Sequence, residues 1–396
     1  MSVTSSPTAA APGVMVLLLP IMAVVLIAFL IIGLALPVLP LHVHQGLGLG
    51  TVAVGLVAGS QFAASLVSRV LAGHYADSRG AKRAVVVGLA GAAAAGLLYL
   101  LSLRFTEAPV LSATILILGR GLLGGAESFI ITGALSWGLA LVDARNAGKV
   151  MAWVGTAMYA AFAFGAPIGT ALYASFGFTA IALATTLVPL ATLLIVAPLR
   201  PVAPQLRARP AFTKVIGAVW VPGVGLALSS IGFGAITAFI ALLFVDRGWS
   251  PVWLAFSAFA VAFIVARVLF GHLPDRLGGA RVALISVLVE AAGQALIWLA
   301  PRPGLALVGA VLTGFGYSLV YPGLGVEAVH RAPPESRGLA MGAYTAFLDL
   351  ALGVASPALG LVADGAGLGS VFLVSALVVL GAATVAGRLL KAPVAT

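Results

Sequence analysis

Long apolar runs separated by short polar turns follow one another along the whole chain. Each run has about 20 residues or more, the length that a helix needs to cross a hydrocarbon core about 30 Å thick. Twelve runs can be placed, so the pattern predicts an all-α membrane protein with twelve transmembrane helices. The predicted spans are residues 14–36, 51–72, 83–103, 109–140, 148–173, 178–198, 216–244, 251–271, 281–300, 305–329, 338–362 and 370–390.

The first span carries no charge in 23 positions and has no basic stretch ahead of it, so we interpret it as a retained helix rather than a signal peptide. Lys and Arg concentrate in alternate loops: fifteen of the 21 follow even-numbered spans or lie in the C-terminal tail, and three follow odd-numbered spans. Because cytoplasmic loops carry the excess of Lys and Arg, we expect a multi-pass protein of the cell inner membrane with both termini in the cytoplasm.

Composition narrows the function classes further. Of the 396 residues, 62% are hydrophobic and 8% are charged, against about 25% charged in an ordinary soluble domain, so a soluble protein is excluded. The net charge of +10 does not indicate a nucleic-acid partner, because the basic residues are scattered singly between apolar runs. The absence of cysteine excludes disulfides and thiolate metal sites, and we expect neither a cofactor nor a metal.

The chain contains an internal duplication. Residues 68–85 read SRVLAGHYADSRGAKRAV and residues 266–283 read ARVLFGHLPDRLGGARVA, at an offset of 198. The duplication predicts two six-helix bundles, residues 1–198 and 215–396, joined by a Pro- and Arg-rich cytoplasmic linker at 199–214. Parallel repeats with a site between them are the plan of one class of transporter. A weaker echo at offset 190 aligns Gly148, Met151 and Pro167 with Gly338, Met341 and Pro357.

The repeated loop is a candidate gate. Its glycines permit a tight turn, and its basic residues can hold the loop at the membrane surface. Such a loop can be only a positive-inside turn, but its recurrence in the second half favours a pair of gates. We expect Arg69 and Arg267 to pair with Asp77 and Asp275 or to reach the interface. The gating candidates are Arg69, Gly73, Asp77, Gly80, Lys82 and Arg83, with Arg267, Gly271, Asp275, Gly278 and Arg281.

Three charged residues fall deep inside predicted spans, where a charge costs about 2.5 to 3.5 kcal/mol and usually has a function. Arg120 and Glu127 lie seven residues apart in the fourth span, so they share one face about 10 Å apart along the axis. We interpret Glu127 as a proton carrier and Arg120 as a sensor of its charge or a site for an anionic substrate group; a static pair or a solvated cavity wall is the alternative. Asp349 in the eleventh span is a second proton-carrier candidate, with a structural role equally open. We interpret Glu290 and Glu327 as structural.

Two histidines stand at the outer end of the first span. The H-x-H spacing of His42 and His44 could bind a metal or sense external pH. Without carboxylate or cysteine neighbours they make a poor metal site, and ordinary interface residues are the preferred interpretation. Aromatic residues can line a substrate cavity or belong to interfacial belts; the candidates are Trp137, Trp153, Tyr159, Tyr317 and Tyr321.

These motifs resemble those of a known family. The loop GHYADSRGAKR resembles the signature G-x-x-x-D-x-x-G-x-[RK]-[RK] of the major facilitator superfamily, with His74 where an apolar residue is usual. In the fourth span, LILGRGLLGGAESF is similar to a pattern of the proton-coupled drug-antiporter branch, at Arg120, Gly124 and Ala126 but with Leu123 in place of its glutamine. The whole chain looks closest to the bacterial YhhS-like subgroup, whose members are often labelled arabinose efflux permeases.

A further resemblance lies in the fifth span, GTAMYAAFAFGAPIGTAL. Gly165, Pro167 and Gly169, together with Gly155, resemble a glycine and proline pattern of antiporters, with Ala166 in place of its usual glycine. The resemblance implies the twelve-helix major facilitator fold, two bundles that rock about a central site, and a monomer.

Taken together, the leading hypothesis is a secondary active transporter that exports a small organic molecule by proton antiport. Proton symport or facilitated uptake of a sugar or organic acid is the alternative. A membrane enzyme is disfavoured, because the chain has no H-E-x-x-H, no G-x-S-x-G and no cysteine. A nucleotide-driven pump lacks its G-x-x-x-x-G-K-[ST] motif. A receptor would leave Arg120, Glu127 and Asp349 unexplained.

Overall fold

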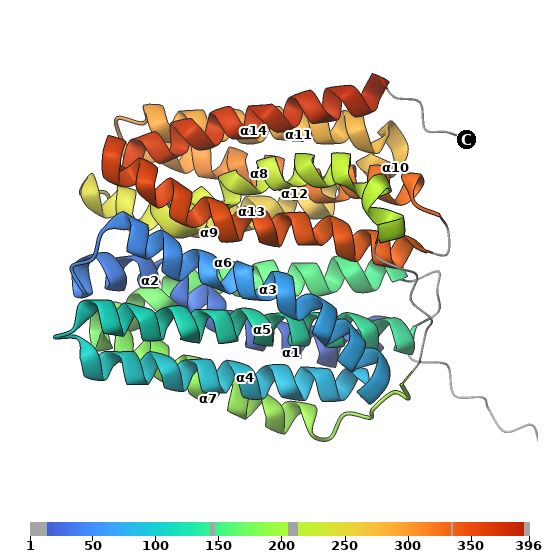
Figure 1. Cartoon of the computed structure of the whole chain (residues 1–396), viewed down its shortest axis with the longest axis horizontal. Helices are drawn as coiled ribbons and strands as arrows, with labels where there is room; N and C mark the ends of the chain where they lie inside the picture. Colours follow the sequence, from blue (N-terminus) through green and yellow to red (C-terminus); the bar gives the residue numbers. More distant parts are fainter. Residues whose placement is uncertain (1–13, 143–146, 205–212, 334–335, 392–396) are drawn as a thin grey trace, which may run out of the picture.

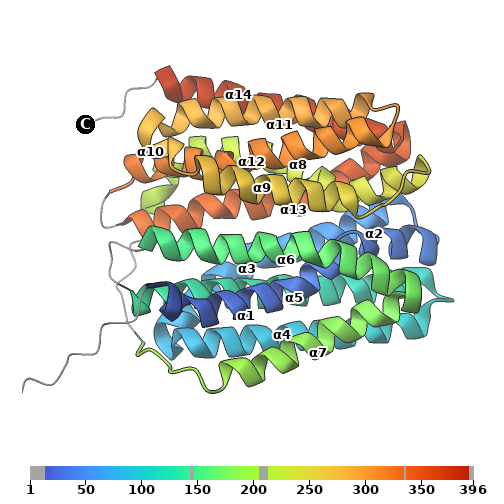
Figure 2. The same cartoon turned by 180° about the vertical axis from the view of Figure 1, so that it is seen from behind.

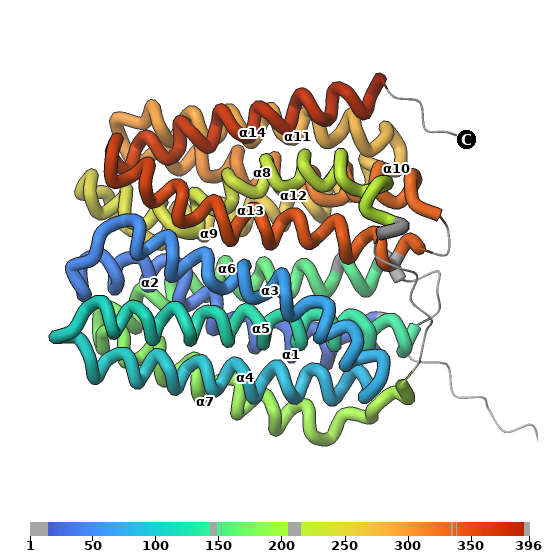
Figure 3. The backbone as a smooth tube through the Cα atoms, in the orientation of Figure 1, coloured from blue at the N-terminus to red at the C-terminus, as the bar shows by residue number. Residues whose placement is uncertain are grey.

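The structure, a computed structural model, describes residues 14–142, 147–204, 213–333 and 336–391. Within these ranges it is helical without any strand, and the long helices run lengthwise through the molecule (Figure 1, Figure 3). The elements are α1 (Val14–Ala35), α2 (Val38–Leu41), η1 (His42–Gly46), α3 (Thr51–Arg79), α4 (Ala81–Ser102), η2 (Leu103–Phe105), α5 (Pro109–Leu141), α6 (Ala147–Phe176), α7 (Phe178–Val196), α8 (Thr213–Asp246), α9 (Leu254–Phe270), α10 (Leu273–Leu277), α11 (Gly279–Leu299), α12 (Pro303–Arg331), α13 (Arg337–Ala366) and α14 (Leu368–Lys391).

The predicted all-α membrane fold is confirmed. Among the described residues, eleven helical segments are long and apolar enough to cross a membrane, and the 17-residue α9 occupies the predicted span 251–271. The largest difference is at the first span, whose helical course continues through α2 and the π-helical η1 to Gly46. Pro37 does not stop it, because this proline is the N-cap of α2, where the missing N–H is not needed.

The helices form two groups. Helices α1 to α7 lie together, and α8 to α14 lie together beside them (Figure 1). The first residues of the linker and the end of α14 lie at one end of the molecule, on the right in Figure 1; we name this the linker end and the opposite one the far end. Residues 205–212 of the predicted linker lie outside the described residues, as do the N-terminal residues 1–13.

Most of the contact between the groups comes from α3 with α13 and α6 with α9, and α8 also contacts α2 and α3 (Figures 1 and 2). Their closest contacts lie toward the far end. Thr51 Oγ1 donates to the Gly360 carbonyl at 2.7 Å, and a Cβ on Gly55 would lie 2.3 Å from the Ser356 carbonyl oxygen. The backbones of α3 and α13 therefore touch, as small residues allow in membrane helices.

The central helices explain why the far end is closed. Two stretches are buried at every position: residues 31–43 of the first helical segment and residues 232–244 of α8. Both stretches are therefore surrounded by other helices at the far end. A helix that is apolar around its whole circumference is stable only when it is enclosed in this way. Toward the linker end α3 and α13 diverge (Figure 1). The two groups thus pack against each other at the far end, and α3 and α13 separate toward the linker end.

Candidate functional site

An ion pair joins the two groups of helices inside the membrane region. Arg69 on α3 donates from Nε to Asp349 Oδ2 at 2.8 Å and from Nη2 to Oδ1 at 3.0 Å, so the contact is bidentate. The Asp349 side chain is 2% exposed and the Arg69 side chain 27% exposed. Bidentate pairing is the strong geometry for an arginine and a carboxylate. The sequence predicts that Arg69 pairs with Asp77 or reaches the interface, and the structure instead pairs it with Asp349. Because α3 stays helical through Arg79, Asp77 lies about two turns beyond Arg69.

A second carboxylate lies beside this pair. Gln61 on α3 donates from Nε2 to Glu127 Oε2 on α5. The two helices pack closely here, since a Cβ on Gly124 would lie 1.9 Å from the Gln61 carbonyl oxygen. Arg69 and Asp349 are among the charged groups that act on Glu127. Two carboxylates and one guanidinium from three helices therefore form a single polar cluster between the two groups.

Arg120 does not take part in an ion pair with Glu127. Its side chain is 2% exposed, and its Nε and Nη1 atoms are buried with no hydrogen-bond partner among the described residues. It lines a cavity of about 10 Å³, roughly the room of one water, with residues from the far half of both groups: Leu36, Leu39, Pro40, Ala58, Phe62 and Thr237. Arg120 and Glu127 therefore have different surroundings on α5. Arg120 lines the small cavity nearer the far end, and Glu127 accepts the hydrogen bond from Gln61.

The second repeat contains an arginine in a different setting. Arg267 on α9 occupies the position of Arg69 in the duplication, but its guanidinium lies over the Phe263 ring, 5.3 Å from the centroid. Its Nε atom is buried without a hydrogen-bond partner among the described residues. The titratable groups that act most strongly on it are hydroxyls of four tyrosines, Tyr159, Tyr321, Tyr317 and Tyr344.

The repeat explains how these two arginines differ. At the offset of 190 that aligns the weaker echo, Asp349 corresponds to Tyr159. The pair of Arg69 with Asp349 across α3 and α13 is therefore matched by Arg267 near Tyr159 across α9 and α6. Sequence reasoning missed Gln61 and the role of Tyr159, although pairing the two offsets would have indicated the latter.

The repeated loops turn at one glycine each. Gly80 has φ +100° and Gly278 has φ +91°, conformations that residues with a side chain rarely adopt. Gly73, predicted to be part of the turn, lies within α3, and Gly271 follows the end of α9. The two loops also differ in secondary structure. In the second repeat Asp275 lies on the short helix α10, whereas the corresponding Asp77 of the first repeat lies within α3.

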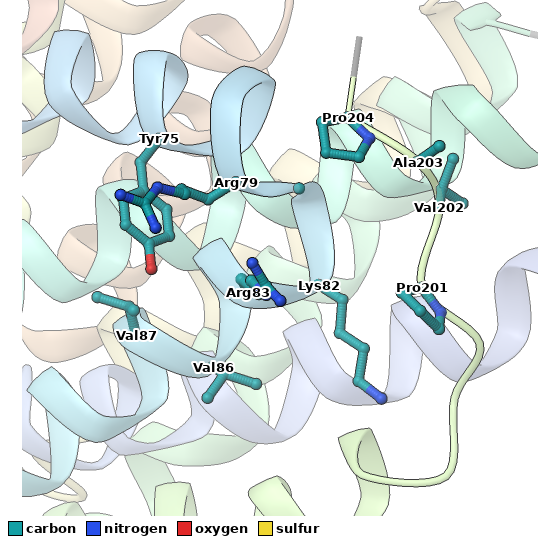
Figure 4. A pocket seen from close by; sticks show the side chains of 11 residues that line it. Tyr75, Arg79, Lys82, Arg83, Val86, Val87, Pro201, Val202, Ala203 and Pro204 are labelled. Carbon is teal, nitrogen blue, oxygen red and sulfur yellow. The ribbon is translucent and has the colours of Figure 1, made fainter.

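The first loop contacts the linker. Lys82 Nζ donates to the carbonyls of Ala197 and Leu199, both at 2.7 Å, and so holds the chain that leaves α7. Between loop and linker lies an open cavity of about 610 Å³ (Figure 4). The side chains that line it include Tyr75, Arg79, Arg83 and Pro204. Arg281 of the second loop lies in the first turn of α11.

The glycine and proline pattern of α6 packs on α1. A Cβ on Gly165 would lie 2.6 Å from the Gly33 carbonyl carbon, and one on Gly169 would lie 2.1 Å from the Leu34 carbonyl oxygen. Pro167 lies inside the helix between them. The pattern therefore provides a backbone-to-backbone contact within the first group of helices.

The remaining polar candidates have local partners. His42 is 6% exposed and stacks on Phe178 at 4.0 Å, whereas His44 is exposed and its Nδ1 lies 2.8 Å from the Leu49 carbonyl oxygen. No group of three or more potential metal ligands occurs in the described ranges. Glu290 accepts a hydrogen bond from Ser229, and Glu327 accepts one from the backbone N–H of Ala280 and pairs with Arg331.

Comparison with known proteins decides the family. The profile described as Major Facilitator Superfamily matches residues 21–256 and 223–396. The chain belongs to the major facilitator superfamily. Among similar proteins of this superfamily are uncharacterized MFS-type transporters of Salmonella typhimurium, 44% identical over 94% of this chain and 96% of that protein, and of Escherichia coli, named YhhS, 41% identical over 92% and 90%.

Solved structures show the same major facilitator fold at low sequence identity. The D-xylose–proton symporter has a TM-score of 0.77 at 13% identity, covering 96% of this chain and 98% of that one. The human organic anion transporter MFSD10 has a TM-score of 0.68 at 16% identity, covering 95% and 100%. This major facilitator chain is therefore a multi-pass membrane transporter, and it is not an enzyme.

Proposed function

We propose that this chain is a proton-coupled secondary transporter that moves a small organic molecule across the inner membrane by alternating access. The observation that carries the proposal is the polar cluster between the two helix groups, in which Asp349 bridges the groups through Arg69 and Glu127 lies beside them. Buried carboxylates inside a membrane transporter are the usual carriers of protons.

Protonation would act directly on the contact between the groups. A proton on Asp349 removes the charge that holds the Arg69 guanidinium, so the bidentate pair loses its ionic attraction. The two groups are then held by their remaining contacts, which include the hydrogen bonds from Thr51 to the Gly360 carbonyl and from Ser257 to the Ala163 carbonyl. The proton would thereby favour separation of α3 from α13, which is the motion that alternating access requires.

We further propose that residues 1–198 and 215–396 move as the two units, that one chain works as a monomer, and that the linker end faces the cytoplasm. The excess of Lys and Arg in the loops supports this orientation. With that orientation the described state is closed to the outside and separated toward the cytoplasm. The repeated loops, at the same end, would act as gates when the linker end closes.

Two forms of coupling follow from two different features. Export by antiport is the form that the α6 pattern of Gly165, Pro167 and Gly169 favours, through its resemblance to antiporters. Co-transport of a proton with the substrate is the second candidate, and the observation behind it is Arg267, a cation in the cluster region without a carboxylate partner among the described residues.

The test is proton movement in inside-out vesicles energised to an acidic lumen, with a quenched pH dye and a panel of sugars and organic acids. Under antiport, a transported compound restores the fluorescence of wild-type vesicles, and Glu127→Gln vesicles do not respond. Glu107→Gln, at an exposed position, is the matched control and should respond like the wild type. Labelled compound that equilibrates equally in wild type and Glu127→Gln without proton movement would contradict proton coupling.

A further inference from the structure

Arg267 is a charge that takes part neither in the ion pair of Arg69 with Asp349 nor in the proposed proton transfer. It lies on the face of α9 that meets the other helix group, because Phe263, one turn away, stacks on Tyr159 of α6 with ring centroids 3.5 Å apart. The residue as a whole has intermediate exposure, and its Nε is buried without a hydrogen-bond partner among the described residues. It lies one turn after Phe263 in α9, toward the end of the helix that leads to α10 at the linker end (Figure 1).

An isolated buried guanidinium is costly, and a membrane protein keeps one where a partner arrives. The neighbours of Arg267 compensate its charge only partly. Phe263 provides the face of its ring, and tyrosine hydroxyls lie around it on three helices, α6, α12 and α13. Three of these hydroxyls already have partners: that of Tyr317 lies 3.3 Å from Ser230 Oγ, that of Tyr321 lies 2.8 Å from Thr345 Oγ1, and that of Tyr344 donates to the Tyr321 carbonyl. No carboxylate among the described residues forms a salt bridge with Arg267.

We infer that Arg267, with Tyr159 beside it, forms the binding site for the anionic group of a small monovalent organic anion, such as a carboxylate. A guanidinium binds a carboxylate through two parallel hydrogen bonds, and aromatic walls suit the apolar body of an organic molecule better than an inorganic ion. This inference rests on the proposed transport function and gives its substrate a chemical class.

The charges near Arg267 couple the binding of anion and proton. Arg69, Arg120 and Asp349 all act on Glu127, and Asp349 is paired with Arg69. The ionised carboxylates of Glu127 and Asp349 repel an anion bound at Arg267, so a proton on either carboxylate weakens that repulsion. The other titratable groups that face Arg267 are tyrosines on α6, α12 and α13. Anion and proton therefore favour each other's binding, which is the arrangement for co-transport.

The test is binding of benzoate to the purified full chain in lipid nanodiscs, measured by calorimetry, with benzyl alcohol as the uncharged analogue. We expect benzoate to bind the wild type, more tightly at lower pH within the range where benzoate stays ionised, and Arg267→Gln to weaken binding about tenfold or more. Arg267→Lys should restore part of the affinity, because it keeps the charge without the bidentate geometry. Arg276→Gln, exposed on α10, is the matched control and should bind like the wild type.

Equal affinity for benzoate in wild type and Arg267→Gln, or no binding of benzoate and of benzenesulfonate by the folded wild type, would overturn the inference. A thermal unfolding transition measured for each variant shows whether it is folded. The outcome is separable from that of the proposed function. Arg267-dependent binding without proton movement contradicts proton coupling alone, whereas proton movement driven by neutral compounds and unchanged in Arg267→Gln contradicts the anion site alone.

Discussion

At the residue scale, two arginines in equivalent positions of a duplicated sequence have different partners. Arg69 meets a carboxylate across the helix groups, and Arg267 meets aromatic rings and hydroxyls. The difference arises because the residue opposite is Asp349 in one interface and Tyr159 in the other. Duplication has thus kept the cations and changed their partners, so that one interface is held by an ion pair and the other is left open to a ligand.

The ion pair leads to a prediction about the conformational equilibrium. Asp349→Asn removes the negative charge of the bidentate contact. Because Arg69 is partly exposed, we expect the described state to lose about 1 kcal/mol of stability relative to the state open at the far end, which shifts the equilibrium between them roughly fivefold. The measurement is the labelling rate of a single cysteine at Ala58, near the closed far half, with a membrane-impermeant thiol reagent. The chain contains no native cysteine, so the signal has no background.

Asp364→Asn provides the matched control, because Asp364 is an exposed acid on the same helix. Its labelling rate should equal that of the parent protein. Slower labelling in Asp349→Asn than in the control would mean that the ion pair opposes the described state rather than stabilising it.

At the element scale, glycines determine which helices approach to backbone contact. On α6, a Cβ at Gly169 would lie 2.1 Å from a carbonyl oxygen of α1, whereas one at Gly155 would meet nothing within 4 Å. Gly169 is therefore required for the packing of α6 on α1, whatever the relation of the pattern to coupling. Gly155 on the same helix has room for a side chain and serves as a comparison.

Substituting each of these glycines by alanine should have opposite effects on stability. Gly169→Ala forces α1 and α6 apart and should destabilise the protein by about 1 to 3 kcal/mol. Gly155→Ala has room for its methyl group and should stabilise α6 by about 0.5 to 1 kcal/mol through helix propensity. Thermal unfolding of the two purified variants checks both signs, and a Gly169→Ala protein as stable as the parent would show that α1 and α6 can move apart freely.

The sequence predicted the elements well and the contacts between them poorly. Apolar run length depends only on the thickness of the membrane, so the predicted spans coincide with helices, although the first two helical segments continue beyond the predicted ends at 36 and 72, to Gly46 and Arg79. The partner of Arg69 could not be read in this way, because Asp349 lies 280 residues away and meets it only after two helix groups pack. Likewise, the seven-residue spacing predicts that Arg120 and Glu127 lie on one face of α5, but it does not predict their partners. Gln61 on α3 donates a hydrogen bond to Glu127, whereas Nε and Nη1 of Arg120 have no hydrogen-bond partner among the described residues.

At the scale of the whole molecule, the charges of the loops divide between its two ends. We expect the linker end to lie in the cytoplasm. A single cysteine replacing Glu107 should react with an impermeant maleimide in intact cells, and one replacing Arg388 should react only after the membrane is opened. Glu107 lies in the turn between η2 and α5, and Arg388 lies in the last turn of α14. Labelling of the Arg388 position in intact cells would reverse the orientation and with it the state assigned to the structure.

Arg120 has a consequence for the leak of protons through such a carrier. Its guanidinium lies in the closed half, next to a space for a single water, and its Nε and Nη1 atoms have no hydrogen-bond partner among the described residues. A hydronium ion crossing from the far end would have to pass this fixed positive charge in surroundings of low dielectric constant, where like charges repel strongly. We therefore expect Arg120 to oppose the passage of an excess proton through the closed half, so that the proton gradient is dissipated only when the carrier completes its transport cycle.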